Sequence, residues 1–493
     1  MSALMRWSLA TLSGCLNGAA FVYYGPLALI ANVPLLWAIP SAQSRREGAA
    51  LGAWVGFLGG VHIFGVLSYG WWIFWAFSAY TASQMTLFGW VVGRAYERLR
   101  GSTGPVRGWR AHHLVLTPAL IWTLTEWLRT VGPVALPASY VGCIADVPWL
   151  RGLLSWSSAG GGLLVSALIA WVCSGLAALS SGLIPGRARS AVSLSASLTP
   201  IMSCGALWLI GTLLAPPPQG ERLTVAALQG GFSNAHYRAA EADPAMSREI
   251  VRTYTELLRR ARSAQSALVI WAESAVRAPL LSTPALQGLL FPRADEAFTL
   301  IGGLAHTDPD GRSYNLAISA ERGRLVDRYA KVKTVPGVEA RFTPGERWRA
   351  LDTQRGKLGV LICFESIYPH AGRALARDGA RLLIVLSNDA GFGETPISRH
   401  MNNRAVVRAV ELGRWLVRVG QAGVTSIVSP SGALVSQLGL FEAGLLTGEV
   451  ELLDHQTPYV RWGLWWLWLC ALGLTPVFGH VTLTAGEGIK LKS

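Results

Sequence analysis

Long apolar runs separated by short basic connections constrain this chain more than any other feature of its sequence. Seven runs precede residue 219 and one follows residue 455, at 7–24, 26–39, 49–68, 72–92, 113–131, 154–183, 191–214 and 462–483. A helix needs about 20 apolar residues to cross a bilayer, so most of these runs are long enough and the second is short. We therefore predict a membrane α-helical bundle of about eight spans.

Basic residues lie on alternate connections between these runs. They are Arg6, Arg45, Arg46, Arg94, Arg98, Arg100, Arg107, Arg110, Arg187, Arg189, Lys490 and Lys492. Connections rich in Lys and Arg stay on the cytoplasmic side of a membrane. The pattern predicts cytoplasmic termini and places residues 219–455 outside the cytoplasm, on the periplasmic face if the membrane is a bacterial inner membrane.

The net charge of +14 sits mainly in the apolar segments. Residues 219–455 hold 28 of the 43 Lys and Arg and 24 of the 29 Asp and Glu, which leaves 15 − 5 = +10 for the rest of the chain. The basic excess therefore reflects membrane topology, and the lipid bilayer is the expected partner. The polar segment has no basic stripe with interleaved aromatics, so we expect no nucleic-acid partner.

The polar segment alternates short β-rich runs with helical stretches. Strands are predicted at 223–228, 267–271, 298–301, 314–319, 323–329, 358–363, 382–387, 415–419 and 425–429, and helices at 245–263, 368–378 and 398–412. This alternation favours a layered α/β domain over an all-β sandwich. We predict three parts: a transmembrane domain at 1–218 ending in a proline linker at 216–218, an extracytoplasmic domain at 219–455, and a final span with its tail at 456–493.

Of the six cysteines, only Cys363 lies in the polar segment. The cysteines and histidines show no metal-binding spacing, so we predict neither a metal nor another cofactor. A single thiol in that segment cannot form a disulfide within it. It is either buried and inert or reactive.

Three chemically useful side chains follow predicted strands. Glu273 follows the strand at 267–271, Lys331 follows the one at 323–329, and Cys363 ends the one at 358–363. Ligand sites in open α/β sheets gather at the carboxyl ends of strands, so these three residues can converge. A carboxylate can take the proton of a thiol, and a fixed ammonium can stabilise the oxyanion formed when the thiol attacks a carbonyl.

Each residue also has an ordinary structural interpretation. A cysteine at the end of an apolar strand is usually a buried structural residue. Glu273 could cap a helix, and Lys331 could be a solvated surface lysine. The flanking sequence favours the chemical interpretation.

Several motifs around these residues occur in a fixed order. They are Trp271-Ala272-Glu273-Ser274-Ala275, Tyr314-Asn315, Tyr329 and Lys331 followed by Glu339, Cys363-Phe364-Glu365, Ser387-Asn388-Asp389-Ala390, and Arg408-Ala409 followed by Glu411 and Gly413-Arg414. Together they resemble the carbon–nitrogen hydrolase (nitrilase) superfamily. With eight spans around the domain, the chain resembles the bacterial apolipoprotein N-acyltransferase family over nearly its whole length.

The resemblance implies a nitrilase-like αββα sandwich and a set of site residues. Glu273 would be the general base, Cys363 the nucleophile, and Lys331 the residue that stabilises the oxyanion. Glu339 would be a second carboxylate that positions the lysine or the incoming amine. Phe364 and Glu365 would flank the nucleophile, and Asn315, Asn388 and Asp389 would shape the pocket.

The resemblance also implies the reaction and its partners. Cys363 would take an acyl chain from a membrane phospholipid donor. The amine of a diacylated lipoprotein acceptor, at its diacylglyceryl-cysteine, would then receive the chain. Two other functions remain open at this point: a membrane-tethered amidase that uses water, and a non-catalytic membrane scaffold that retains the fold.

The sequence departs from the family pattern beside the site. Phe364 replaces a tyrosine, Gly391 replaces a tryptophan, and Gln421 replaces an asparagine. Gly337-Val338-Glu339 replaces a Phe-Gly-Glu stretch, and Gly230-Gly231 lacks the usual asparagine. These changes concern the acyl donor and acceptor more than the covalent chemistry.

Overall fold

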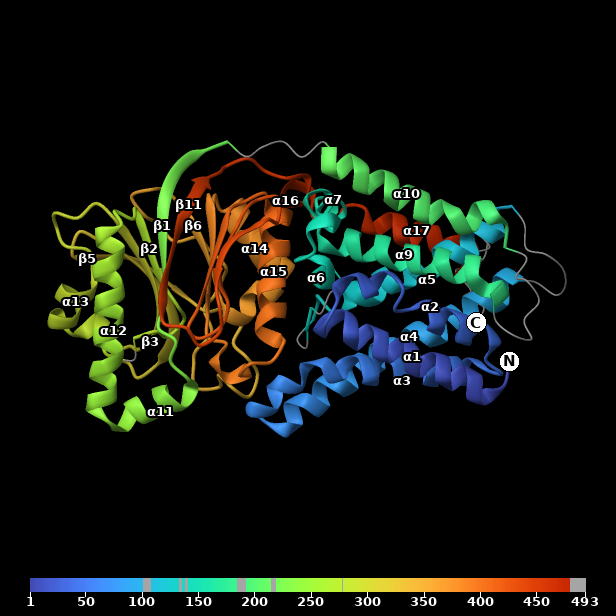
Figure 1. The fold of residues 1–493 in the computed structure, drawn as a ribbon, viewed down its shortest axis with the longest axis horizontal. Helices are drawn as coiled ribbons and strands as arrows, with labels where there is room; N and C mark the ends of the chain where they lie inside the picture. Colours follow the sequence, from blue (N-terminus) through green and yellow to red (C-terminus); the bar gives the residue numbers. More distant parts are fainter. Residues whose placement is uncertain are drawn as a thin grey trace, which may run out of the picture.

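The fold was analysed in a computed structural model that describes residues 1–100, 108–132, 135–137, 141–183, 192–213, 219–276 and 278–478. Several features named above lie outside these ranges: Arg107, Arg187, Arg189, the linker at 216–218, Lys490 and Lys492. The described chain forms an elongated molecule with a sheet-containing part at one end and a helical part at the other (Figure 1).

Helices form the part of the molecule built from the apolar runs. Up to residue 213 they are α1 (Ala3–Val22), η1 (Gly25–Leu29), α2 (Val33–Ala38), η2 (Ile39–Ser41), α3 (Arg45–Gly60), η3 (Val61–Ser68), α4 (Trp71–Arg100), α5 (Trp109–Leu128), α6 (Val141–Ile144), η4 (Pro148–Leu150), α7 (Arg151–Leu154), α8 (Ser157–Gly160), α9 (Gly162–Leu179), η5 (Ser180–Leu183) and α10 (Leu194–Leu213). After the second part, α16 (Pro458–Trp462) and α17 (Leu467–Phe478) return the chain to the helical part.

Three helical segments among the described residues are long and apolar enough to cross a membrane: Arg45–Ser68, Gly162–Leu179 and Leu194–Leu213. Gly25–Ser41 and Leu467–Phe478 are apolar but shorter. The total of eight spans therefore stays a prediction. Large apolar side chains project from these helices, with Met202 69 % and Trp468 81 % exposed, as expected for surfaces that contact lipid.

The run predicted at 154–183 is not one continuous helix. The chain breaks at Gly161, whose φ of 75° lies in the left-handed region, and a Cβ there would lie 2.8 Å from the ring of Tyr459. Only glycine combines that φ with so close a neighbour at little cost. Apolar composition hid this break, because every residue around it is compatible with a membrane helix.

Helices α3 and α4 approach closely along a stripe of glycines. Gly48, Gly52 and Gly56 face α4, and a Cβ on Gly52 would lie 2.0 Å from the carbonyl oxygen of Met85. Small residues at this spacing let two backbones pack against each other in a membrane, where little hydrophobic driving force exists between helices.

The second part of the molecule contains two sheets. The first has the strand order β11-β1-β2-β3-β4-β5 and the second β10-β9-β8-β7-β6. The strands are β1 (Glu221–Gln229), β2 (Leu268–Trp271), β3 (Thr299–Thr307), β4 (Ser313–Glu321), β5 (Arg324–Ala330), β6 (Leu358–Ile362), β7 (Leu382–Ser387), β8 (Leu416–Gly420), β9 (Thr425–Val428), β10 (Leu434–Leu438) and β11 (Gly444–Leu452). Strands β1, β2 and β3 run parallel, as do β6, β7 and β8, so their carboxyl ends share one edge of each sheet.

The two sheets pack face to face and helices cover their outer faces. On β6, Val360 and Ile362 point into the core between the sheets, whereas Leu361 points to the opposite side. Helix α12 (Pro244–Ser263) lies outside the first sheet, and α14 (Pro369–Arg377) and α15 (Ile397–Leu412) lie outside the second (Figure 1). The order helix, sheet, sheet, helix is the layered α/β arrangement that the sequence predicted.

Helix α15 belongs to both parts of the molecule. Its buried side chains share one apolar core with the second sheet and with the helical part. Polar contacts cross the same boundary: Arg399 pairs with Asp146 at 2.6 Å, and the Asn403 amide donates to the Gly142 carbonyl at 3.0 Å. The second sheet therefore rests on the helical part through a single shared layer.

Nine strands and three helices of this part were predicted within two residues of their observed bounds, except that β3 continues six residues beyond the predicted end at 301. The prediction missed α11 (Asn234–Ala242), α13 (Pro284–Leu290), β10 and β11. Strand β11 contains two glycines and several exposed positions, so its apolar alternation is weak. It forms because β1 offers it an antiparallel partner over nine residue pairs, which local sequence cannot reveal.

The α3–α4 contact yields a stability prediction. Gly52→Leu should lower the free energy of unfolding by about 1–3 kcal/mol, because the new side chain would meet the α4 backbone. The measurement is thermal unfolding of the detergent-purified protein. Gly205→Leu is the matched control, since a Cβ on Gly205 meets nothing within 4 Å. Equal melting temperatures for the two variants would contradict the close contact.

Candidate active site

Cys363 lies directly after β6, where the strand turns into the short helix η7 (Cys363–Ile367). Its φ of 49° is in the left-handed region, which is uncommon for any residue other than glycine. Two hydrogen bonds hold the turn: Glu365 Oε2 accepts from the Ile362 N–H at 2.9 Å, and the Ser366 hydroxyl donates to the Cys363 carbonyl at 2.7 Å. The half-buried thiol is thus presented on a sharp strand-to-helix turn.

Lys331 extends the β4–β5 pairing by one residue beyond β5. Its N–H donates to the Asn315 carbonyl at 2.9 Å, and its carbonyl accepts from the Gly345 N–H at 2.8 Å. Its side chain is 1 % exposed, and Nζ lies 3.0 Å from Glu273 Oε1 and 2.9 Å from Glu339 Oε1. The ammonium is therefore fixed between two carboxylates.

Asn315 and backbone N–H groups complete this cluster. The Asn315 amide donates to Glu273 at 2.7 Å and to Glu339 at 3.0 Å. The Val335 N–H donates to Glu339 Oε2 at 2.7 Å, and the Asn388 N–H donates to Glu273 Oε2 at 2.9 Å. Neutral donors thus satisfy the oxygens that Lys331 leaves free, as buried carboxylates require.

Asn388 and Asp389 follow β7, next to the strand that precedes Cys363. Asp389 is buried and forms an ion pair with Arg418 on β8, and it accepts a hydrogen bond from the Ser387 hydroxyl at 2.6 Å. This pairing fixes the turn that aims the Asn388 N–H at Glu273. The sequence analysis assigned Asn388 and Asp389 to the pocket and named Ser387 only as part of their motif, and it did not name Arg418.

Glu365 ties the cysteine turn to the lysine loop. Its Oε1 accepts from the Tyr329 hydroxyl at 2.7 Å, from the Val332 N–H at 2.8 Å and from the Trp348 indole at 3.2 Å. Its Oε2 accepts from Ile362, as described above. Burial raises the pKa of Glu365, although these hydrogen bonds act in the opposite direction. This carboxyl group therefore holds the positions of Cys363 and Lys331 relative to each other.

The charges around the thiol favour its protonated form. Burial and the negative charge of Glu273 raise the pKa of Cys363 to about 12, with a further contribution from Asp389, while Lys331 and a hydrogen bond with Ser387 lower it. Burial alone would lower the pKa of Lys331, but Glu273, Cys363 and Glu339 raise it above its usual value. At neutral pH the arrangement therefore favours an ammonium and a protonated thiol over an ionised thiolate.

Phe364 packs edge-on against Tyr368, with ring centroids 5.5 Å apart. The side-chain amide of Gln421 donates to the Ser274 carbonyl at 3.5 Å, and the backbone carbonyl of Gln421 accepts from the Gly231 N–H. Sequence reasoning missed Tyr69 and Asn234, which also reach the site. Both are ordinary polar residues in ordinary contexts, and no local pattern singles them out.

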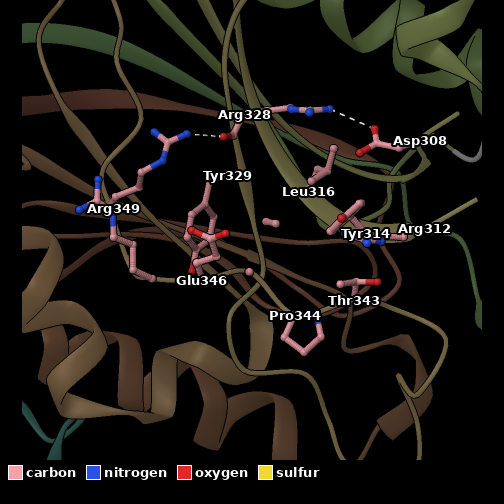
Figure 2. A pocket seen from close by; sticks show the side chains of 13 residues that line it. Asp308, Arg312, Tyr314, Leu316, Arg328, Tyr329, Thr343, Pro344, Glu346 and Arg349 are labelled. Atoms are coloured by element: carbon pink, nitrogen blue, oxygen red, sulfur yellow. Dashed lines mark hydrogen bonds and ion pairs between the residues drawn. The ribbon is translucent and has the colours of Figure 1, made fainter. Parts of the chain in front are cut away.

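A surface pocket of about 450 Å³ lies behind the lysine loop and is lined by β5 and by Thr343, Pro344 and Gly345 (Figure 2). None of Glu273, Lys331 and Cys363 lines it. Its arginines are largely neutralised, since Arg328 pairs with Asp308 at 3.1 Å and Arg349 with Asp327 at 2.7 Å. Within the described ranges, no group of three or more His, Cys, Asp and Glu is arranged to hold a metal ion.

Two family models match the chain. The carbon–nitrogen hydrolase model matches residues 247–457, and the apolipoprotein N-acyltransferase N-terminal domain model matches residues 13–175. A Geobacter metallireducens protein named apolipoprotein N-acyltransferase is 32 % identical over 53 % of this chain and 54 % of its own. A Pseudomonas syringae protein of the same name is 31 % identical over 57 % and 59 %.

A solved carbon–nitrogen hydrolase from Helicobacter pylori G27 is 19 % identical over 50 % of this chain and 94 % of its own, with a TM-score of 0.39. The chain spans little more than half the length of the relatives it matches.

The matched ranges cover both parts of the molecule. The carbon–nitrogen hydrolase model covers most of the sheet-containing part, and the apolipoprotein N-acyltransferase N-terminal domain model covers most of the helical part that precedes it. The chain is thus similar to apolipoprotein N-acyltransferases in both of its parts.

The charge arrangement predicts that removal of the Glu273 charge makes the Cys363 thiol easier to ionise but abolishes turnover. Glu273→Gln removes a negative charge that raises the thiol pKa, so alkylation of Cys363 by iodoacetamide at about pH 9 should become roughly tenfold faster. Turnover should nevertheless be lost. The rate is followed by mass spectrometry of the Cys363 peptide. Glu346→Gln, in the surface pocket, should leave the alkylation rate unchanged, and slower alkylation in Glu273→Gln would refute the charge assignment.

Proposed function

We propose that this protein moves an acyl chain from a membrane phospholipid, through a thioester on Cys363, to the α-amino group of a diacylglyceryl-cysteine at a lipoprotein N-terminus. The observation that carries the proposal is the coupling of Cys363 to Glu273 and to the buried Lys331 ammonium, in a domain that packs on apolar helices. The match to the apolipoprotein N-acyltransferase N-terminal domain model, and the similarity to proteins of that name, support the same reaction.

The first half-reaction forms the thioester. Cys363 Sγ attacks the ester carbonyl while Glu273 accepts the thiol proton, and Lys331 stabilises the oxyanion of the tetrahedral intermediate. The carbon–oxygen bond then breaks, and the proton passes from Glu273 to the leaving oxygen of the lysophospholipid. Because the thiol pKa is raised, proton transfer accompanies the attack and no free thiolate accumulates.

The second half-reaction regenerates the enzyme. The acceptor amine attacks the thioester, a carbon–nitrogen bond forms, and the carbon–sulfur bond breaks. Glu273 takes a proton from the amine and returns one to the sulfur. Glu339 holds Lys331 throughout, and Asn315, Asn388 and Asp389 keep Glu273 oriented.

We propose the same topology that the charge pattern predicts. Residues 1–218 would form seven spans, 219–455 the catalytic domain on the periplasmic side of the inner membrane, and 456–493 the last span and a cytoplasmic tail. Both substrates are anchored in the bilayer, so a nucleophile held at its surface needs to search only the plane of the membrane. Exposed large apolar side chains on the helical part support the membrane spans in this proposal.

The covalent step gives the direct test. After incubation of the membrane-purified protein with a phospholipid labelled in its acyl chain, mass spectrometry should find the label on the Cys363 peptide. Cys363→Ala should reduce product formation by more than about a thousandfold without changing the melting temperature, because it removes only the nucleophile. Cys15→Ala is the control, since Cys15 is exposed and distant from β6 in the sequence. A labelled product in Cys363→Ala would exclude the thioester.

The acceptor is tested separately. An N-terminal diacylglyceryl-cysteine peptide should discharge the acyl-enzyme to an amide faster than water discharges it, because the amine is the stronger nucleophile at the same position. The measurement is the ratio of N-acyl peptide to free fatty acid. Release of fatty acid alone, at the same rate with and without the peptide, would instead identify an amidase-like hydrolase.

A further inference from the structure

One turn of the helical part reaches the candidate active site. It is the Ser68–Trp72 turn, which joins η3 to α4. The Ser68 hydroxyl donates to the Gly391 carbonyl, and the Tyr69 ring packs edge-on against Phe392 with centroids 5.4 Å apart. Gly391 and Phe392 belong to the segment that follows Asn388 and Asp389. The turn thus contacts the loop that helps to position Glu273.

Glycines on two loops leave room for the aromatic residues of this turn. A Cβ on Gly391 would lie 2.0 Å from the Tyr69 hydroxyl oxygen, and a Cβ on Gly337 would lie 2.7 Å from the Trp72 ring. Gly337 belongs to the loop that carries Glu339. Both positions are departures from the family pattern noted above. The Ser68–Trp72 turn therefore fills space on both sides of the site that larger residues would otherwise occupy.

The Tyr69 hydroxyl lies within the charge network of the site. Burial raises the pKa of Tyr69, electrostatic interactions with Cys363, Asp389 and Glu273 raise it further, and a hydrogen bond with the Asn234 side chain lowers it. The phenol therefore stays neutral and retains its hydrogen-bonding capacity at physiological pH.

A chain of contacts connects this hydroxyl with Glu273. Asn234 Oδ1 accepts from the Asn388 side-chain amide at 3.4 Å. The Asn388 N–H donates to Glu273 Oε2 at 2.9 Å. Tyr69, Asn234 and Asn388 thus form a continuous path from the helical part to the carboxylate beside Cys363.

We propose that Tyr69 is a positioning residue that acts through Asn234 and Asn388 to hold Glu273 in the orientation needed to accept the Cys363 proton. This inference rests on the proposed role of Glu273 in the acyl transfer. A carboxylate that loses a well-aligned N–H donor is protonated more easily and is less well oriented as a base. Removal of the Tyr69 hydroxyl should therefore affect the acylation step and its dependence on pH.

The test uses Tyr69→Phe, which keeps the ring between Gly391 and Phe392 and removes only the hydroxyl. Acylation of Cys363 is measured by mass spectrometry between about pH 5 and pH 9, with labelled phospholipid and separately with a p-nitrophenyl ester. Tyr69→Phe should slow acylation about tenfold with both donors and move the acid limb of the profile to higher pH, with an unchanged melting temperature. Asn234→Ala should have the same effect, and the double variant should be no slower than either single variant.

Tyr23→Phe is the matched control, because Tyr23 is 78 % exposed at the end of α1 and should leave rate and profile unchanged. The inference would be overturned if Tyr69→Phe kept the wild-type acylation rate and the wild-type acid limb of the pH profile. Additive effects of Tyr69→Phe and Asn234→Ala would also overturn it. The two donors separate this inference from the proposed function. If the wild type reacts with the p-nitrophenyl ester but not with phospholipid, the proposed donor is wrong and the ester profile still decides the role of Tyr69. No acylation of Cys363 by either donor would overturn both.

Discussion

The buried contact of the Lys331 ammonium with Glu273 and Glu339 is the interaction on which the rest of the site depends. One positive charge faces two negative charges, and hydrogen bonds from an amide and from backbone N–H groups stabilise the remaining negative charge. Desolvating such groups is costly, so the cluster is stable only when every partner is in place. This requirement accounts for the number of loops that converge on it.

The excess negative charge in the cluster also governs the thiol. A thiolate at Cys363 would add a further negative charge beside Glu273 and Asp389, and Lys331 offsets this only in part. The thiol is therefore kept protonated until an electrophile arrives to take the charge away. Such a site combines an unreactive resting thiol with a base beside it, which suits the proposed acyl transfer.

The shared helix α15 connects this chemistry with the membrane part. It supports the second sheet, from which Cys363 and Asn388 extend, and it packs on the helical part through one apolar core. The Ser68–Trp72 turn makes a second connection, through its contacts with Gly391 and Gly337. The carboxyl edge of the second sheet is thus tied to the apolar helices by two separate sets of contacts.

Much of the fold could be read from the chain itself. Long apolar runs without a polar face predict helices in lipid. Strands β6 and β7 are continuous apolar runs because both of their faces are covered. Glu273, Lys331 and Cys363 were identifiable because each follows a strand and carries a recognisable flanking motif. Three features could not be identified from the sequence: the break at Gly161, the strand β11, and the hydrogen bonds that Glu365 accepts from Tyr329 and Trp348. Each arises from contacts between segments distant in sequence, and local pattern carries no information about such contacts. For the same reason, the order of residues along the chain is enough to identify the reactive groups, whereas their charge balance and the presence of Tyr69 at the site depend on how distant segments pack together.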